Sequence, residues 1–67
     1  MIATFGHNEF KATVEYCGGD MHTVTYTGPD MKEFKNFIFN EDREKGEKDS
    51  IEMAERFVRT KEATHGK

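Results

Sequence analysis

Apolar and polar residues alternate most clearly over residues 9–16. The apolar positions there are Phe10, Ala12, Val14 and Tyr16. A period of two is typical of a β-strand with one buried face. The same period returns over residues 22–27, where the positions facing one side are His22, Val24 and Tyr26. Two strands are therefore predicted, over residues 9–16 and 22–27.

The Gly-Gly-Asp segment at residues 18–20 predicts a tight hairpin turn between these strands, because glycine readily adopts positive φ. A two-residue loop would place Val14 opposite Thr23, an apolar side chain against a polar one. A three-residue loop over residues 18–20 instead places Val14 opposite Val24 and keeps one face apolar. We expect the odd loop. The same register pairs Ala12 with Tyr26, Tyr16 with His22, Thr13 with Thr25 and Glu15 with Thr23.

The N-terminal residues 2–5 have a short apolar pattern that ends at Gly6-His7-Asn8, a sequence typical of a turn. This pattern predicts a third strand, which would extend the hairpin to a three-stranded meander. Whether this strand pairs within the domain or with another chain stays open at this point.

After Gly28-Pro29 the period changes to that of a helix. Asp30 followed by Glu33 has the spacing of a capping box, which predicts a helix over residues 30–39. Its apolar stripe would be Met31, Phe34, Phe37 and Ile38. Phe39 lies off that stripe, which leaves three alternatives: the helix ends there, residues 37–39 form a short strand, or Phe39 is an exposed anchor.

Residues 40–48 are charged and contain Gly46, so they are interpreted as a solvated loop. Asp49 with Glu52 repeats the capping spacing and predicts a second helix over residues 49–60. Its apolar stripe would be Ile51, Ala54, Phe57 and Val58. Two ion pairs at a spacing of four residues are expected on its wet side, Glu52 with Arg56 and Glu55 with Arg59. Residues 61–67 are expected to form a disordered tail.

Together these elements predict one α+β domain over residues 1–67. A small antiparallel sheet, a hairpin or a three-stranded meander, would pack against two C-terminal helices. Both helices would lie on the sheet face that carries Phe10, Val14, Val24 and Tyr26.

The composition changes this picture in two respects. With 67 residues the domain is near the lower size limit for a stable core, although its six Phe and two Tyr favour an aromatic one. A dimer interface would supply further burial, so a homodimer stays an open alternative. The net charge of −3 arises from interleaved acidic and basic residues, so nucleic acid is not the first partner to expect. A lone Cys17 excludes an internal disulfide.

The residues offer little for catalysis or metal binding. Cys17 and His22 are the one conceivable nucleophile and base, but they are expected on opposite strand faces. His7 and His65 have no second ligand at a zinc-finger spacing. Ser50, the only serine, is interpreted as a residue of a helix start. We therefore expect no catalytic residues, no metal site, no cofactor and no enzymatic activity.

The most prominent polar feature is an acid-rich segment that follows Phe39. Its acidic residues are Glu41, Asp42, Glu44, Glu47 and Asp49. Arg43, Lys45 and Lys48 are interleaved with them, so one interpretation is a solvated segment whose charges compensate locally. The other is a recognition segment that, with Phe39 as anchor, meets a basic surface of another protein.

In its small size, mild acidity and sheet-plus-helix organisation, the chain resembles the short single-domain inhibitors encoded by phages and mobile elements, including anti-CRISPR proteins. This resemblance of type covers the whole chain and rests on no sequence motif. It implies a non-enzymatic protein that inhibits a larger bacterial protein or nucleoprotein complex, such as a CRISPR effector, by covering its surface. It also implies a cytoplasmic location, that of the host for a phage-encoded protein. No direct contact with nucleic acid or membrane is expected.

The alternative hypothesis is a small nucleic-acid-associated regulator. It would use basic residues expected on the outer faces of the helices, namely Lys32, Lys35, Arg56, Arg59 and Lys61. Glu33, Glu52 and Glu55 on the same faces weaken this hypothesis, and no helix-turn-helix spacing is present.

Overall fold

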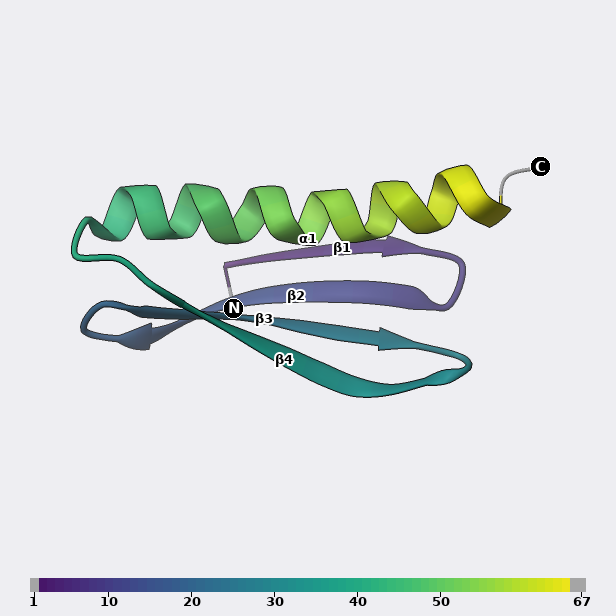
Figure 1. Cartoon of the computed structure of the whole chain (residues 1–67), viewed down its shortest axis with the longest axis horizontal. Helices are drawn as coiled ribbons and strands as arrows, with labels where there is room; N and C mark the ends of the chain where they lie inside the picture. The colour runs from purple at the N-terminus through teal and green to yellow at the C-terminus, as the bar shows by residue number, and fades with distance from the viewer. Residues whose placement is uncertain (1, 66–67) are drawn as a thin grey trace.

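Four consecutive strands form an antiparallel meander, and one long helix lies across one face of it (Figure 1). The structure is a computed structural model that describes residues 2–65, and the side chains of residues 2–61. The sheet has the order β1-β2-β3-β4. The elements are β1 (Ala3–His7), β2 (Phe10–Gly18), β3 (Met21–Gly28), β4 (Met31–Phe39) and α1 (Arg43–His65).

The register between β2 and β3 is the one that the alternation predicts. Val14 lies opposite Val24, and the other four predicted pairs are also present. The odd parity has a different origin from the expected three-residue loop. Gly18 pairs with Met21 across a two-residue turn, and a register shift between Tyr16 and Gly18 accommodates Cys17 as an extra residue. Gly18 and Gly19 have φ of 96° and 59°, which glycine adopts without strain.

The third strand is confirmed and pairs within the chain. β1 lies antiparallel to β2, with Ala3 opposite Val14 and Phe5 opposite Ala12. The strand continues to His7, two residues beyond the expected end. Asn8 makes the turn with a φ of 57°, a conformation that asparagine tolerates better than most residues.

The helix expected over residues 30–39 is wrong, because these residues form the turn before β4 and the strand itself. β4 pairs antiparallel with β3, with Tyr26 opposite Phe34 and His22 opposite Ile38. The alternation of a strand is hard to see here, because large apolar side chains occupy both faces of β4. Of the three alternatives for residues 37–39, the strand is correct, and it extends back to Met31.

The helix expected over residues 49–60 is present but longer, and the loop over residues 40–48 is therefore mostly wrong. α1 begins at Arg43, and Asp49 is an internal residue rather than a cap. Residues 43–48 are mainly glutamate, lysine and arginine, which have high helix propensity. The disordered tail is wrong as far as His65, where α1 ends, and residues 66–67 lie outside the described residues.

Small side chains bring α1 close to the sheet. Gly46, Ser50, Ala54 and Val58 recur every four residues and are all buried. Gly46 therefore does not interrupt the helix but lets it pack closely on the sheet, since a Cβ there would lie 3.1 Å from Nδ1 of His22. Ser50, expected at a helix start, lies inside α1, and its Oγ donates a 2.7 Å hydrogen bond to the carbonyl oxygen of Gly46.

The core lies between α1 and the middle of the sheet. Its buried apolar residues are Ala12, Val14, Val24, Tyr26, Ala54 and Val58. The α+β class is confirmed, and the arrangement is corrected from a two- or three-stranded sheet with two helices to a four-stranded sheet with one helix.

Candidate functional site

Phe39 and the acidic residues after it lie at one end of the molecule, where β4 passes into α1. The Phe39 side chain is 71% exposed, the largest value among the exposed phenylalanines. The connection is anchored behind it, because the backbone N–H of Asn40 donates to the carbonyl oxygen of Asp20 at 2.9 Å. Glu41 and Glu44 are also exposed. We refer to Phe39, Glu41 and Glu44 as the Phe39 surface.

Asp42 has a structural task within the acidic segment. Its Oδ1 accepts hydrogen bonds from the backbone N–H groups of Glu44 at 3.1 Å and Lys45 at 3.3 Å, which caps the start of α1. The side-chain oxygen of Asn40 accepts from the N–H of Asp42 at 2.9 Å. The negative charge of Glu44 in the first turn also interacts favourably with the helix dipole.

The remaining acidic residues, Glu47 and Asp49, differ in their surroundings. Asp49 lines a shallow polar depression on α1 together with Asp42, Glu44 and Glu52, and with the lysines Lys45 and Lys48. Glu47 is not among the residues that line it. The structure thus places Asp42, Glu44 and Asp49 beside compensating lysines, which agrees with local charge compensation over that part of the helix.

The cap can be tested separately from any binding role. Replacing Asp42 by alanine is expected to lower the free energy of unfolding by about 1 kcal/mol, because two helix N–H groups lose their acceptor. Asp42→Asn keeps an acceptor oxygen and is expected to cost much less. Thermal melts followed by circular dichroism measure both, and equal losses in the two variants would show that the charge, not the cap, is what stabilises.

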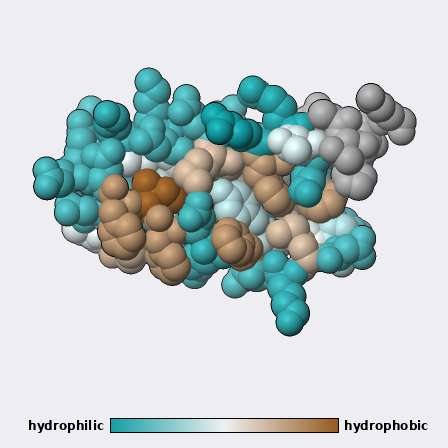
Figure 2. Space-filling model, viewed as in Figure 1, coloured by the Kyte–Doolittle hydropathy of each residue, from teal (hydrophilic) through white to brown (hydrophobic). Residues whose placement is uncertain are grey.

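Two further exposed phenylalanines on β4 were missed as surface residues, because both were assigned to a buried helical stripe. Phe34 is 57% exposed and Phe37 is 53% exposed. In a strand their positions differ by an odd number, so they lie on opposite faces. Phe34 lies on the α1 side and stacks on Tyr26 at a centroid distance of 5.9 Å. Figure 2 shows hydrophobic surface gathered over the region of β4, below the helix.

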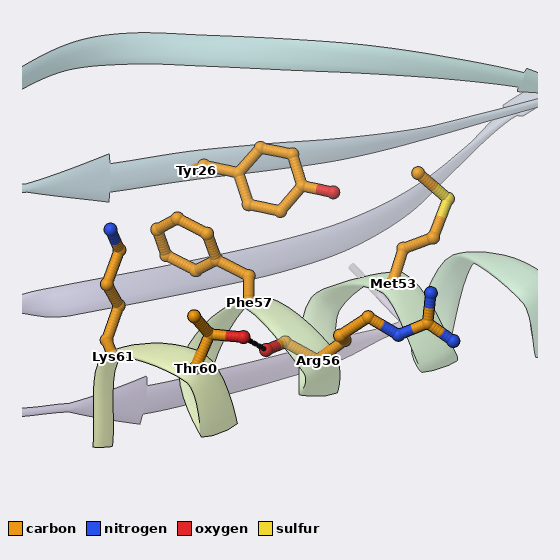
Figure 3. Close-up of a pocket in the computed structure, with 6 residues that line it drawn as sticks. All are labelled: Tyr26, Met53, Arg56, Phe57, Thr60 and Lys61. Atoms are coloured by element: carbon orange, nitrogen blue, oxygen red, sulfur yellow. Dashed lines mark hydrogen bonds between the residues drawn. The ribbon is translucent and has the colours of Figure 1, made fainter. Parts of the chain in front are cut away.

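A groove of about 310 Å³ lies between α1 and Tyr26 of β3, the strand next to β4. We refer to it as the α1–β4 groove. Its lining residues are Tyr26, Met53, Arg56, Phe57, Thr60 and Lys61, and Figure 3 shows the two aromatic rings between the long side chains of the helix. Tyr26 and Phe57 lie 4.7 Å apart between ring centroids. Lys61 Nζ lies 5.5 Å from the centroid of Phe57, a cation–π distance.

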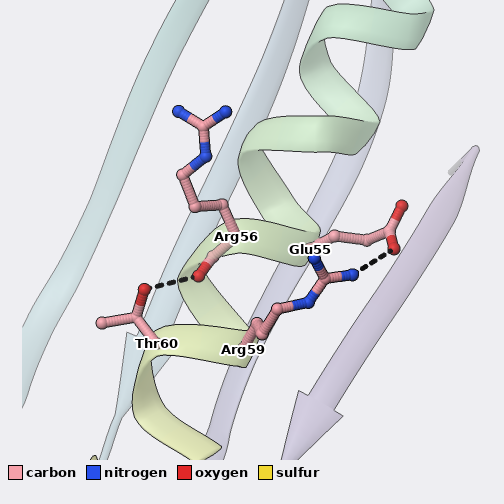
Figure 4. Close-up of polar contacts among 4 residues, drawn as sticks. All are labelled: Glu55, Arg56, Arg59 and Thr60. Carbon is pink, nitrogen blue, oxygen red and sulfur yellow. Dashed lines mark hydrogen bonds and ion pairs between the residues drawn. The ribbon is translucent and has the colours of Figure 1, made fainter. Parts of the chain in front are cut away.

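The basic residues of α1 point in different directions. Arg59 is 79% exposed and forms a 3.5 Å ion pair with Glu55, as predicted, whereas the Arg56 side chain extends on another side of the helix (Figure 4). The hydroxyl of Thr60 donates to the carbonyl oxygen of Arg56 at 2.8 Å, which holds the backbone beside the groove. Arg56 lines the groove and also a neighbouring depression with Glu52, Glu55 and Arg59, whereas Arg59 does not line the groove.

The basic residues of the nucleic-acid hypothesis are divided between two faces. Lys35 lies on the sheet face that α1 does not cover, with Glu33 and Thr25 among its neighbours. Arg56 and Lys61 lie at the α1–β4 groove, on the opposite side of the sheet. Lys32 and Lys35 are on a strand and not on a helix.

The ionisation of Tyr26, a residue of the groove, is shifted. Burial raises the pKa of the Tyr26 hydroxyl above 10.0, and a hydrogen bond with the Asn36 side chain opposes this in part. The folded state therefore binds the phenolic proton more tightly than the unfolded state. Its contribution to stability is complete below about pH 10 and is lost as the pH rises through the folded-state pKa.

This linkage predicts a difference between wild type and Tyr26→Phe at alkaline pH. As the pH rises above about 10, stability of the wild type should fall more steeply than that of the variant, which has no phenol to ionise at this position. Urea unfolding at a series of pH values measures the two slopes. Parallel curves for the two proteins would contradict the assignment.

Cys17 and His22 lie on opposite faces of the sheet. Cys17 is exposed, and its Sγ lies 3.5 Å from the hydroxyl of Thr23, on the sheet face away from α1. His22 is 1% exposed and packs beside Tyr16, at a ring distance of 5.1 Å. Within the described part of the chain, no three or more histidine, cysteine or acidic residues gather where they could hold a metal ion.

Comparison of the chain with models of protein families, with curated proteins and with solved structures finds no match. Among the described residues, no helix combines the length and the apolar character needed to cross a membrane.

Proposed function

We propose that this chain is a non-enzymatic binding protein that inhibits a larger bacterial protein or nucleoprotein complex by covering a basic surface of it. The observation that carries the proposal is the Phe39 surface, in which a phenylalanine with 71% exposure is followed two and five residues later by exposed glutamates. An apolar anchor beside charged residues is the arrangement of many energetically dominant contacts in protein interfaces.

The position of this surface supports a contact role. Phe39 contributes little to the core, and the turn behind it is held by the Asn40–Asp20 backbone hydrogen bond and by the Asp42 cap. A rigid support lowers the entropy cost of binding through Phe39 and the glutamates. A basic partner surface would be attracted by Glu41 and Glu44, which favours fast association.

The proposal is tested by charge reversal that leaves the cap intact. Full-length protein is used to capture partners from nuclease-treated bacterial lysate, and the affinity for the captured protein is then measured. The double variant Glu41→Lys/Glu44→Lys is expected to weaken binding by about tenfold or more, since attraction becomes repulsion at two positions. Phe39→Ala is expected to weaken it by a similar factor.

A matched control makes the same change of net charge elsewhere. Glu15→Lys/Glu33→Lys reverses two exposed glutamates on the strands and should leave the affinity nearly unchanged. Binding that survives both the Glu41/Glu44 reversal and Phe39→Ala would contradict the proposal.

A gel shift at low salt separates this function from the nucleic-acid hypothesis. We expect no tight binding to bare DNA or RNA, because glutamates accompany the basic residues and those basic residues lie on two faces. Tight binding that weakens steeply with salt would favour the regulator instead.

A further inference from the structure

The helix covers only part of the sheet. α1 packs mainly on β2, with β1 and β3 on either side, and makes little contact with β4 (Figure 1). β4 is one of the two edge strands of the described sheet, and β1 is the other. On the side that α1 occupies, this strand presents Phe34, more than half exposed, and the partly buried Ile38.

The part of the sheet that α1 leaves uncovered is wide enough for one more helix. Neighbouring strands lie about 4.8 Å apart, so β4 lies about 9.6 Å from β2 along the sheet. Packed helices lie about 8 to 10 Å apart. A second helix beside α1 would therefore lie directly over β4, with the α1–β4 groove along its line of contact.

The chemistry of the groove indicates which helix this would be. Its floor is apolar, with Tyr26, Phe57 and Met53, and its rim carries the cations Arg56 and Lys61. Among residues 2–61, whose side chains the structure describes, no acidic residue lines it. An amphipathic helix buries its apolar stripe on such a floor, and carboxylates that flank the stripe would meet the two cations.

We propose that the α1–β4 groove binds an acidic amphipathic helix of a partner protein, which completes the helical layer over β4. This goes beyond the function proposed above, because it uses a different surface with the opposite charge. The nine residues of β4 span about 30 Å, which a helix of about 18 to 20 residues matches.

A synthetic peptide tests the groove directly. The probe is an amphipathic helix of about 18 residues, with leucines on one stripe and glutamates flanking it. The matched control peptide has lysine at every glutamate position. Fluorescence anisotropy with the full chain is expected to show a Kd below about 100 µM for the glutamate peptide and at least tenfold weaker binding of the lysine peptide.

Protein variants locate the contact. Arg56→Glu/Lys61→Glu is expected to weaken binding of the glutamate peptide by about tenfold or more. Lys48→Glu/Arg59→Glu makes the same charge change at exposed positions outside the groove and should alter the affinity by less than about twofold. Phe34→Ser, at an exposed ring, should weaken binding while the melting temperature stays close to that of the wild type.

Nuclear magnetic resonance provides a second readout that does not depend on any variant. Shifts of backbone amide signals on adding the peptide should concentrate on β4 and on residues 53–61 of α1. The proposal is overturned by equal binding of both peptides, by no binding up to about 1 mM, or by shifts confined to other parts of the chain. It is also overturned if single-stranded DNA or RNA binds the groove in preference to the peptide, or if a second copy of the chain already occupies it in sedimentation and shift measurements.

Discussion

Replacing Phe57 by alanine is expected to lower the free energy of unfolding by about 3 kcal/mol, the low end of the range for truncating a core phenylalanine. Phe57 links the helix to the sheet through two ring contacts, at 4.7 Å to Tyr26 and 6.3 Å to Phe10. Its partial exposure at the groove places the loss at the low end. In a domain of 67 residues this is a large share of the total stability.

Phe39→Ala is the matched control for this loss. The same truncation at a side chain with 71% exposure is expected to change the free energy of unfolding by about 0.5 kcal/mol or less. Chemical denaturation of both variants provides the comparison. If Phe39→Ala cost as much as Phe57→Ala, Phe39 would belong to the core and the Phe39 surface would lose its anchor.

Replacing His22 by leucine is expected to raise the free energy of unfolding by about 1 to 2 kcal/mol. Both ring nitrogens of His22 are buried and lack a hydrogen-bond partner among the described residues. Burial removes these nitrogens from water without compensation, and leucine of similar size removes that penalty. The leucine side chain would still fill much of the space beside Gly46.

His22→Ala separates polarity from packing. It also removes the unpaired nitrogens, but it leaves a cavity between β3 and Gly46, so a net loss of stability is expected. Thermal melts of the two variants should therefore move in opposite directions from the wild type. A loss in His22→Leu comparable to that in His22→Ala would show that the imidazole has favourable contacts that outweigh its unpaired atoms.

The hairpin was predicted well from the sequence because its register follows from residues that are close together in the chain. Only one parity keeps Val14 opposite Val24 on an apolar face, and the observed pairing follows it. The turn itself was less predictable, since a bulge at Cys17 and a three-residue loop give the same parity. The choice between them depends on turn backbone geometry that alternation does not encode.

Residues 31–39 were assigned to a helix because β4 is an edge strand that is only partly covered, which hides the alternation typical of a strand. Phe34 and Phe37 lie on opposite faces, and neither face is covered enough to make the period of two visible. The spacing of the apolar residues in this strand happens to match the apolar stripe of a helix. These residues are Met31, Phe34, Phe37 and Ile38. A hairpin turn at Pro29-Asp30 was the competing signal, with Gly28 paired to Met31 across it.

The candidate site was predicted only in part. Its residues could be named from charge and from the position of Phe39 off the expected stripe. The cap at Asp42, the depression that Asp42, Glu44 and Asp49 share with two lysines, and the exposure of Phe39, Glu41 and Glu44 could not be predicted. The reason is that α1 begins six residues earlier than the sequence indicated. The α1–β4 groove had no sequence signal, since it depends on β4 being a strand.

The sequence by itself determined the α+β class, the register of β2 and β3, and the apolar face on which the helix packs. These follow from periodicity within short segments, where neighbouring residues alone decide which side chains share a face. Only the tertiary structure decided that residues 31–39 join the sheet and that Gly46 lies inside a helix. Both depend on partners distant in the chain: β3 satisfies the backbone of β4, and His22 packs where any larger residue than Gly46 would be crowded.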